Sequence, residues 1–364
     1  MPVQNFESLN SSTDVATTRT LLHESIPLTG AIVSGTYNEG AGTTETNIKN
    51  YTHGMFQSVF DYPYLSSSAN HIFDLTIGYD EGSTLSASAN TQNSKKINMY
   101  NQFAQVLLGY TGAANTVEIF ESDLLIDDNN NQMDSVFFIN FSRLLTKDEV
   151  KPGSFSITVG TGSWALPFDT SGSSRVTFLD ASASSTQGTA NTIGGDYGVL
   201  YQDNGDATYG DGVSGSGVVF YQAGIAILTS SIFVATPDFY PAVLSQGGGA
   251  QTVNAAFTGS SISASCDALR HRIYNLSFNN STELNSAIYF CRTPHNKYNY
   301  SSNPTYQSDS KIRVKSVASD TPVTYITTIG LYNASNELLA VAKLSEPLKK
   351  DPTNDITIRV RLDY

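Results

Sequence analysis

The chain has 364 residues, of which 40% are hydrophobic and only 15% charged, and its net charge is −13. This composition excludes a disordered polyelectrolyte, which needs more charge and fewer aromatic residues. The negative charge also argues against binding to duplex nucleic acid, because contacts with a phosphate backbone need clustered Lys and Arg.

The length and the shifts in composition predict several regions. Two or three domains, or one domain with large insertions, are usual at this length. Residues 161–216 are rich in Gly, Ser, Thr, Asn and Asp, which favours long loops and short strands. We therefore expect an N-terminal arm or edge strand at 1–46, a mixed α/β region at 47–160, inserted loops at 161–216 and a β-rich region at 217–364.

Two helices are predicted before residue 160. Apolar side chains recur at helical spacing over about 49–60, and Pro63 stops the pattern. The clearer helix covers 95–108, where apolar residues fall on one face. Ser94 is its expected N-cap, and Gly109 its expected stop signal.

Strands are predicted over most of the remaining chain. Before the C-terminal region they are expected at 71–79, 117–126, 135–143, 154–160, 176–179, 197–201, 218–221, 225–229, 231–234, 272–278 and 284–292. The segment around Gly247-Gly248-Gly249 is expected to be a loop, and Arg270-His271-Arg272 is interpreted as charges that flank a strand. The predicted fold class is α+β and β-rich, with antiparallel sheets and a few helices.

The last forty residues give the clearest pattern. Two apolar runs, 324–331 and 338–344, flank a polar turn at 333–336 and predict a β-hairpin. Over 356–364 apolar and polar residues alternate strictly, which is typical of a strand with one buried and one wet face. We expect a C-terminal hairpin and strand module whose last strand belongs to a sheet.

The cysteines and the apolar segments favour folding in a reducing cytoplasm. Cys266 and Cys291 are too few and too far apart for a disulfide framework or a metal site, so both are expected to be buried free thiols. The N-terminus lacks the pattern of a signal peptide. The longest apolar stretch, 218–235, is interrupted by polar residues and predicts buried strands, so no membrane segment is expected.

Motifs that would indicate catalysis or a bound cofactor are missing. The acidic runs 127–134, 203–206 and 211–212 are interpreted as turns, with a weakly held cation as the alternative. The segment 212–216 resembles a Gly-x-Ser-x-Gly elbow but has Ser in place of the last Gly. We predict no enzyme, and no catalytic, cofactor-binding or metal-binding residues.

Two weaker signals of chemistry also have structural interpretations. A carboxylate pair for glycoside hydrolysis is a spatial arrangement, and Trp164 in a Gly/Ser loop gives little support for a sugar site. The five histidines are scattered without ligand spacing and are expected to be structural, with His53 on the helical face of 49–60: His23, His53, His71, His271 and His295.

Several blocks of the chain resemble a conserved structural protein of contractile-tailed, T4-like phages of marine cyanobacteria. These blocks are 51–64 with 66–71, 95–108, 136–160, 270–306 and 325–364. The C-terminal block is similar to a module that recurs in tail and baseplate proteins of such phages. The resemblance implies a virion component without enzymatic activity, first in the tail or baseplate and second at the neck or capsid surface.

The implied partners are other virion structural proteins and further copies of the chain in a symmetric assembly. The particle would assemble in the cytoplasm of the host bacterium. The 20 Tyr and 18 Phe suit large interfaces, and the low charge suits a tight lattice. Two alternatives stay open: a capsid decoration protein, and a carbohydrate-binding host adhesin that presents its site on 161–216.

Overall fold

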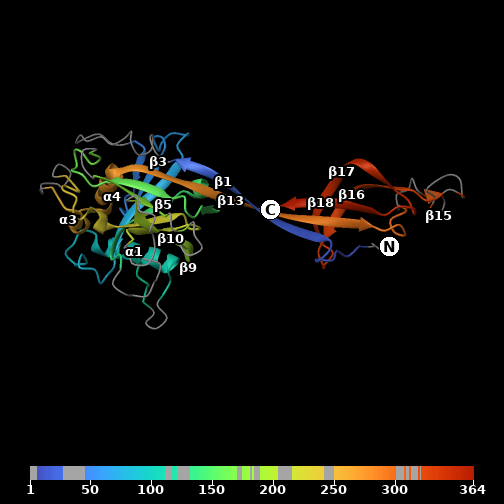
Figure 1. Ribbon diagram of the computed structural model, residues 1–364, viewed down its shortest axis with the longest axis horizontal. Helices are drawn as coiled ribbons and strands as arrows, with labels where there is room; N and C mark the ends of the chain where they lie inside the picture. The colour runs from blue at the N-terminus through green and yellow to red at the C-terminus, as the bar shows by residue number, and fades with distance from the viewer. Residues whose placement is uncertain are drawn as a thin grey trace. The chain divides into compact units, whose positions relative to one another are not determined.

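The structure is a computed structural model of the chain, shown in Figure 1. It describes residues 6–27, 46–110, 116–121, 132–169, 174–180, 183, 189–203, 215–241, 250–300, 307–308, 311–312, 319 and 321–364. The contacts of the chain divide it into unit 1 (1–21 and 283–364) and unit 2 (22–282). Strands β1 (Val15–Pro27) and β13 (Ile273–Thr293) each have residues in both units.

Unit 2 is built on an antiparallel sheet in the order β13-β7-β8-β10-β11-β12-β5-β4-β3-β2. Its strands are β2 (Ile48–Asn50), β3 (Gln57–Phe60), β4 (His71–Tyr79), β5 (Ser135–Phe141), β6 (Glu149–Val150), β7 (Ser156–Gly160), β8 (Arg175–Leu179), β9 (Thr189–Thr192), β10 (Gly195–Gln202), β11 (Gly217–Phe220) and β12 (Ile225–Thr229). Strand β1 also pairs with β13 in this sheet, so its strands come from all four predicted regions of the chain. The β-rich α+β fold class is confirmed.

Strand β5 is buried on both faces, so its side chains divide between two apolar cores. Phe137 and Ile139 belong to the first core, and Val136 and Phe138 to the second. Because successive strand residues point to opposite faces, this run of apolar residues needs cover on both sides. Helices α3 (Val253–Gly259) and α4 (Ile262–Arg272) contribute to the first core, with the 3₁₀ helix η2 (Ser230–Phe233).

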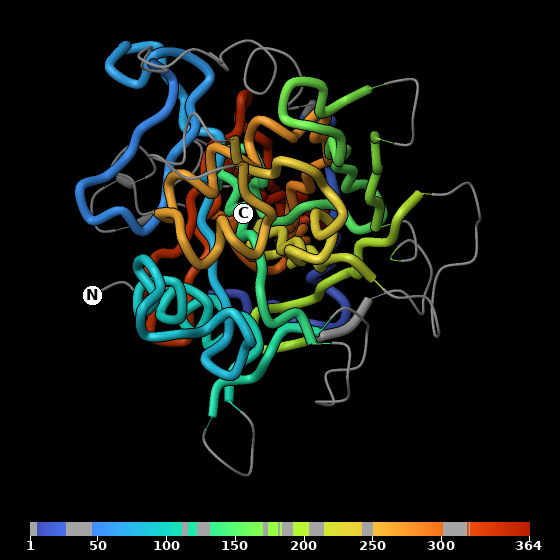
Figure 2. Tube along the Cα trace, turned by 90° about the vertical axis from the view of Figure 1, so that its left-hand side faces the viewer, coloured from blue at the N-terminus to red at the C-terminus, as the bar shows by residue number. Residues whose placement is uncertain are grey.

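Helix α1 (Asn93–Leu107) covers the second core. It approaches strand β4 closely at Gly78, where a Cβ atom would lie 2.9 Å from the carbonyl oxygen of Lys96. A larger residue at this position would push the helix away from the sheet. The coils of α1, in cyan, and of α3 and α4, in yellow to orange, can be followed in Figure 2.

The predicted helix at 95–108 is confirmed, with differences at its start. It begins two residues earlier than expected, after Gln92, so Ser94 lies inside the helix instead of capping it. Gly109 follows the helix with a φ of +99°, a backbone conformation that favours glycine, and this confirms it as the stop signal.

The predicted helix at 49–60 is wrong. The segment forms strands β2 and β3, which pair through Asn50 and Gln57, with a turn between them. In this turn Tyr51 and Phe56 contact each other with ring centroids 4.8 Å apart. The helical spacing arose because turn residues and strand residues both supplied apolar side chains.

Other element predictions need smaller corrections. The segment 231–234 is mainly the 3₁₀ helix η2, and the two strands expected at 272–278 and 284–292 form the single strand β13. Strand β5 ends at Phe141, before the short helix α2 (Arg143–Thr146). In the predicted strand 117–126, Val117 and Glu121 make isolated bridges, and 122–126 lie outside the described residues.

Unit 1 contains the predicted C-terminal module. Strand β16 (Thr324–Tyr332) pairs with β17 (Leu338–Lys350) in a two-stranded sheet, and β18 (Ile356–Asp363) pairs with β13. In β18 the buried side chains of Ile358 and Val360 alternate with exposed arginines, as the pattern predicted. The short strands β14 (Gln307–Ser308) and β15 (Lys311–Ile312) pair with each other.

Candidate interaction surface

Unit 1 has very little apolar core. Both core clusters consist of residues of unit 2. Among the described residues of unit 1, the buried apolar side chains are only Ala287, Val323, Ile358 and Val360. Burial of apolar surface is the main favourable term in folding, and two-stranded sheets are marginally stable without further packing. The hairpin β16–β17 therefore lacks the apolar cover that strands in stable sheets have.

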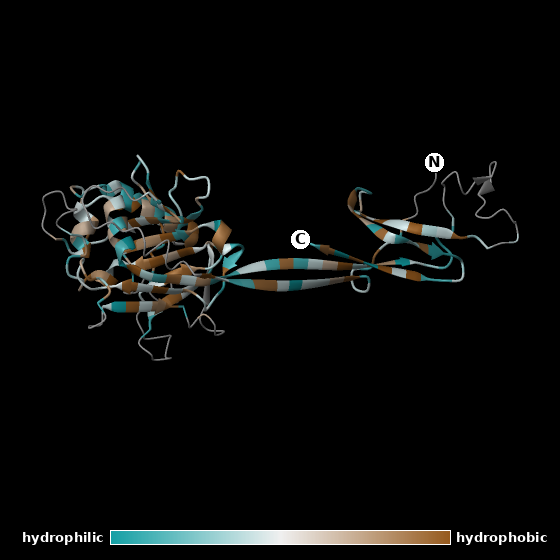
Figure 3. Ribbon diagram, turned by 90° about the horizontal axis from the view of Figure 1, so that it is seen from above, coloured by the Kyte–Doolittle hydropathy of each residue, from teal (hydrophilic) through white to brown (hydrophobic). Residues whose placement is uncertain are grey.

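Five large apolar side chains are exposed where the hairpin turns, and we call them the hairpin cluster. They are Phe6 (45% exposed), Tyr332 (43%), Leu338 (52%), Leu339 (68%) and Val341 (53%). The Phe6 ring meets the Tyr332 ring edge-on, with centroids 5.0 Å apart. Brown bands mark apolar residues on the strands of unit 1 in Figure 3.

Local geometry holds the hairpin cluster together. Tyr332 pairs with Leu338, and Gly330 pairs with Val341 across the two strands. A Cβ atom at Gly330 would lie 2.8 Å from Cε2 of Tyr332 and 3.2 Å from Cδ1 of Leu338. The missing side chain at Gly330 thus lets both residues close over the backbone. The result is an exposed patch whose shape is set by the pairing of the strands.

The predicted turn at 333–336 is confirmed and fixes the end of the hairpin. The Asn333 side-chain oxygen accepts hydrogen bonds from the backbone N–H groups of Ser335 (2.9 Å) and Glu337 (2.8 Å). The Asn333 amide donates to the Glu337 carboxylate at 2.6 Å. Asn336 has a φ of +63°, a conformation that Asn adopts more readily than most residues.

The other end of the hairpin is anchored by a buried cation. The Nζ atom of Lys350 donates to the Asn299 side-chain oxygen at 2.9 Å and to the Asp351 carbonyl oxygen at 2.8 Å. The hydroxyl of Thr324 donates to the carbonyl oxygen of Tyr298 at 2.7 Å. A buried ammonium is tolerated only when its donors are satisfied. The hairpin is therefore held at one end, and the hairpin cluster lies at the other.

The charge of the chain is unevenly divided between the units. Unit 1 carries 11 Lys and Arg against 10 Asp and Glu, a net charge of +1. Unit 2 carries 9 Lys and Arg against 23 Asp and Glu, a net charge of −14. Unit 2 of one copy therefore repels unit 2 of another, whereas unit 1 meets little repulsion.

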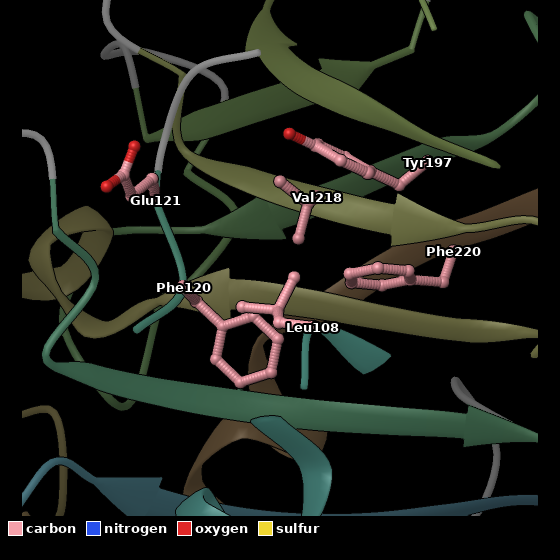
Figure 4. Close-up of a pocket in the computed structure, with 6 residues that line it drawn as sticks. All are labelled: Leu108, Phe120, Glu121, Tyr197, Val218 and Phe220. Atoms are coloured by element: carbon pink, nitrogen blue, oxygen red, sulfur yellow. The ribbon is translucent and has the colours of Figure 1, made fainter. Parts of the chain in front are cut away.

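A small pocket in unit 2 offers no room for a substrate. Its volume is about 10 Å³, roughly that of one water. Figure 4 shows the residues around it, which are apolar except for Glu121 and the Tyr197 hydroxyl: Leu108, Phe120, Glu121, Tyr197, Val218 and Phe220. We interpret it as a packing gap of the second core.

Buried ionisable groups in unit 2 bond to the protein itself. Asp180 accepts hydrogen bonds from the N–H groups of Phe155 (2.8 Å) and Gly153 (2.9 Å) and from the Tyr221 hydroxyl (3.1 Å). Burial raises the pKa of Asp180 to about 6. Lys96 donates to carbonyl oxygens at the end of α3, including Ser260 at 2.8 Å, and burial lowers its pKa to about 8. Both groups fix loops and helix ends.

The cluster Arg270-His271-Arg272 directly precedes strand β13, in agreement with the sequence interpretation, but it belongs to a helix. These residues form the last turn of α4, and all three are buried. The Arg272 guanidinium donates to the carbonyl oxygens of Gly160 (3.1 Å), Gly162 (2.8 Å) and Asp238 (3.1 Å). A cation at a helix C-terminus is favourable, and these bonds tie α4 to two loops. Hydrophobic periodicity gave no sign of this role.

Trp164 packs against one histidine, and three other histidines have different partners. The Trp164 ring stacks on His271 with centroids 4.0 Å apart, so one ring face is covered. His71 contacts Asp74 at 2.8 Å, and His23 contacts the Ser281 hydroxyl at 3.1 Å. His53 is exposed in the turn before β3, where it stacks on Tyr51, and not on a helical face.

The remaining sequence predictions have mixed outcomes. Cys266 is a buried free thiol as predicted, whereas Cys291 is free but only half-buried. Most of the acidic runs 127–134 and 203–206, all of 211–212 and most of the elbow-like segment 212–216 lie outside the described residues. Within the described part of the chain, no His, Cys, Asp and Glu residues cluster as metal ligands would, and no helix is long and apolar enough to span a membrane.

Comparison with known proteins leaves the family of the chain open. No family model, curated protein or solved structure matches it. The resemblance to phage structural proteins therefore stays a prediction.

Proposed function

We propose that the chain is a structural subunit of a tailed-phage virion, placed in the tail or baseplate and acting by binding neighbouring subunits. The observation that supports this proposal is the exposed hairpin cluster on a unit with four buried apolar side chains among its described residues. Exposure of such an apolar surface to water is unfavourable in free energy, and contact with another subunit removes this unfavourable term.

The chemistry of the hairpin cluster fits a protein interface. Phe, Tyr and Leu supply apolar area, and aromatic residues are enriched at the centres of interfaces. Charged residues flank the cluster at Glu337 and Lys343, as expected for a polar rim. We propose binding, without catalysis, as the activity of this surface.

The location is tested on purified particles. Virions of the phage that encodes the chain are separated from head-only and tail-only particles, and each fraction is analysed by quantitative mass spectrometry. We expect the protein in complete virions and in tails. Its recovery only in heads, at a copy number that matches capsid subunits, would support the decoration alternative. Its absence from all particles would refute the proposal.

Two matched variants test the surface. Leu339 is 68% exposed in unit 1, and Leu166 is 64% exposed in unit 2. We expect Leu339→Ser to reduce incorporation into particles and Leu166→Ser to leave it unchanged, with both proteins folding normally. Equal incorporation of the two variants would contradict the role of the hairpin cluster.

The adhesin alternative receives no support from Trp164. Sugar-binding sites use open aromatic faces, and this ring is stacked on His271. A glycan array with the purified chain provides the direct test. Binding of a host polysaccharide that Leu166→Ser weakens and Leu339→Ser preserves would favour the adhesin over the structural subunit.

A further inference from the structure

The first half of strand β17 is an open apolar strand edge. Its residues 338–342 read Leu-Leu-Ala-Val-Ala, and β16 is the only strand that pairs with β17 among the described residues. Exposed apolar edge strands readily pair with strands of another chain. Proteins protect such edges with Lys, Pro and bulges. In β17 the Lys and Pro come later, at Lys343 and Pro347, and its register against β16 shifts both at Leu339 and over 344–347.

The charges that flank this edge are complementary under a two-fold rotation. Glu337 lies three residues before Ala340, and Lys343 lies three residues after it. When two such strands run antiparallel about Ala340, each Glu337 lies opposite the other copy's Lys343. Parallel pairing in register would place Glu337 on Glu337 and Lys343 on Lys343, which like-charge repulsion opposes.

We propose that two copies of the chain pair through β17 in antiparallel register centred on Ala340. Each Leu339 then lies opposite the second copy's Val341, and the two sheets of two strands become one sheet of four. This inference rests on the proposed subunit-binding role and names its partner as a second copy of the chain. A symmetric contact of this type uses the same patch on both subunits.

The charge of unit 1 supports a copy of itself as the occupant. Its net charge of +1 allows two copies to approach, whereas the −14 of unit 2 opposes contacts through unit 2. Four paired strands also satisfy the backbone groups along the open edge of each β17. A partner with a strongly charged surface would gain nothing from the uncharged run at 338–342.

A single cysteine tests the register. In antiparallel pairs, opposite Cα atoms lie about 4.5–5.5 Å apart, a separation that a disulfide can bridge. In the full-length protein, Ala340→Cys should form a covalent dimer under mild oxidation, seen on a non-reducing gel. The controls are the wild type, which retains Cys266 and Cys291, and Thr327→Cys, an exposed position on β16. Ala340→Cys that stays monomeric, or equal dimer yields from Thr327→Cys, would overturn the proposal.

Exchange of the flanking charges provides a second test without cysteine chemistry. Glu337→Lys and Lys343→Glu each place like charges opposite one another twice in a dimer, and each should weaken dimerisation about tenfold by sedimentation. The double variant Glu337→Lys/Lys343→Glu should recover the wild-type dissociation constant. An equal mixture of the two single variants should form heterodimers as tight as the wild-type dimer. Additive weakening in the double variant would refute the pairing.

These tests separate the pairing from the virion proposal. Dimers of the isolated chain, with the protein missing from purified particles, would retain the pairing and refute the virion role. Protein present in particles, with Ala340→Cys uncrosslinked both in solution and in particles, would retain the virion role and refute the pairing.

Discussion

Replacement of Asp180 by Asn tests whether the buried carboxyl of unit 2 is as desolvated as its surroundings indicate. Asp180 follows β8 directly, is 1% exposed and accepts bonds from two N–H groups and the Tyr221 hydroxyl. Burial dominates over these bonds and raises its pKa from 3.8 to about 6. Asn keeps the size of the side chain and removes its titration.

The direction of the pH dependence follows from the protons that Asp180 binds in the folded and unfolded states. Between pH 4 and 6 the folded chain holds a proton on Asp180 that the unfolded chain has lost, so the stability contributed by this group is full below pH 4. It is lost as the pH rises through 6. A shift of about 2 units corresponds to about 3 kcal/mol. The stability of the wild type relative to Asp180→Asn should therefore fall by about 3 kcal/mol from pH 4 to pH 7.

Urea denaturation, followed by the fluorescence of the single Trp164, measures this difference at pH 4, 5, 6 and 7. Glu81→Gln, which removes one exposed carboxylate from the same unit, controls for the change in net charge. Parallel stability curves for the wild type and Asp180→Asn over this range would show that the carboxyl is hydrated in the folded protein. The reasoning from burial would then be wrong.

Three further substitutions test the buried groups of unit 2. Between pH 8 and 10.5 the unfolded chain holds the Lys96 proton and the folded chain does not, so wild-type stability should rise by about 3 kcal/mol over this range. Lys96→Met should abolish this rise. Equal dependence of the unfolding free energy on pH in both proteins, measured by urea denaturation, would contradict this. Arg272→Met should lower the unfolding free energy by about 3 kcal/mol or more, since three carbonyl groups lose a charged donor, and an unchanged melting temperature would refute it. Phe137→Ala should cost about 3–5 kcal/mol by calorimetry, and a loss below 1 would show that the first core collapses around the gap.

Local sequence patterns predicted most of the helices and strands, because these elements depend mainly on the residues within and next to them. Strand β5 and the hairpin β16–β17 follow from apolar runs with turn residues between them, and α1 follows from one apolar face and Gly109. The segment 49–60 failed because a turn between two short strands placed Tyr51 and Phe56 at helical spacing. The spacing of apolar residues alone does not distinguish a helix from two short strands with a turn when the strands are shorter than five residues.

Helices α3 and α4 were missed although the sequence contains their start signals. Thr252 and Ser261 cap them, and their side-chain oxygens accept from the N–H groups of Ala255 and Ala264 at 3.3 and 3.2 Å. The many Gly, Ser and Ala residues around these caps made the apolar face of each helix hard to recognise in the sequence. A search for Ser or Thr before short apolar stretches would have found both helices.

The hairpin that carries the candidate surface was predicted, but the exposure of its apolar side chains was not. The hairpin pattern identifies β16 and β17, yet exposure depends on which other segments cover them, and that is not a local property. The apolar run 338–344 was predicted to be a hairpin strand, and its residues Leu338, Leu339 and Val341 are among the exposed side chains of unit 1. The exposure of these apolar residues is the observation on which the proposed interface rests.

The contrast between the units supports this interpretation of the hairpin. Unit 2 contains both apolar cores and carries a net charge of −14. Unit 1 has the same kind of strand-forming sequence without a comparable core, and its charges nearly cancel. In the proposed pairing, Leu339 and Val341 gain cross-strand neighbours from the second copy. Under the proposed pairing, the stability of unit 1 should depend on protein concentration while that of unit 2 does not.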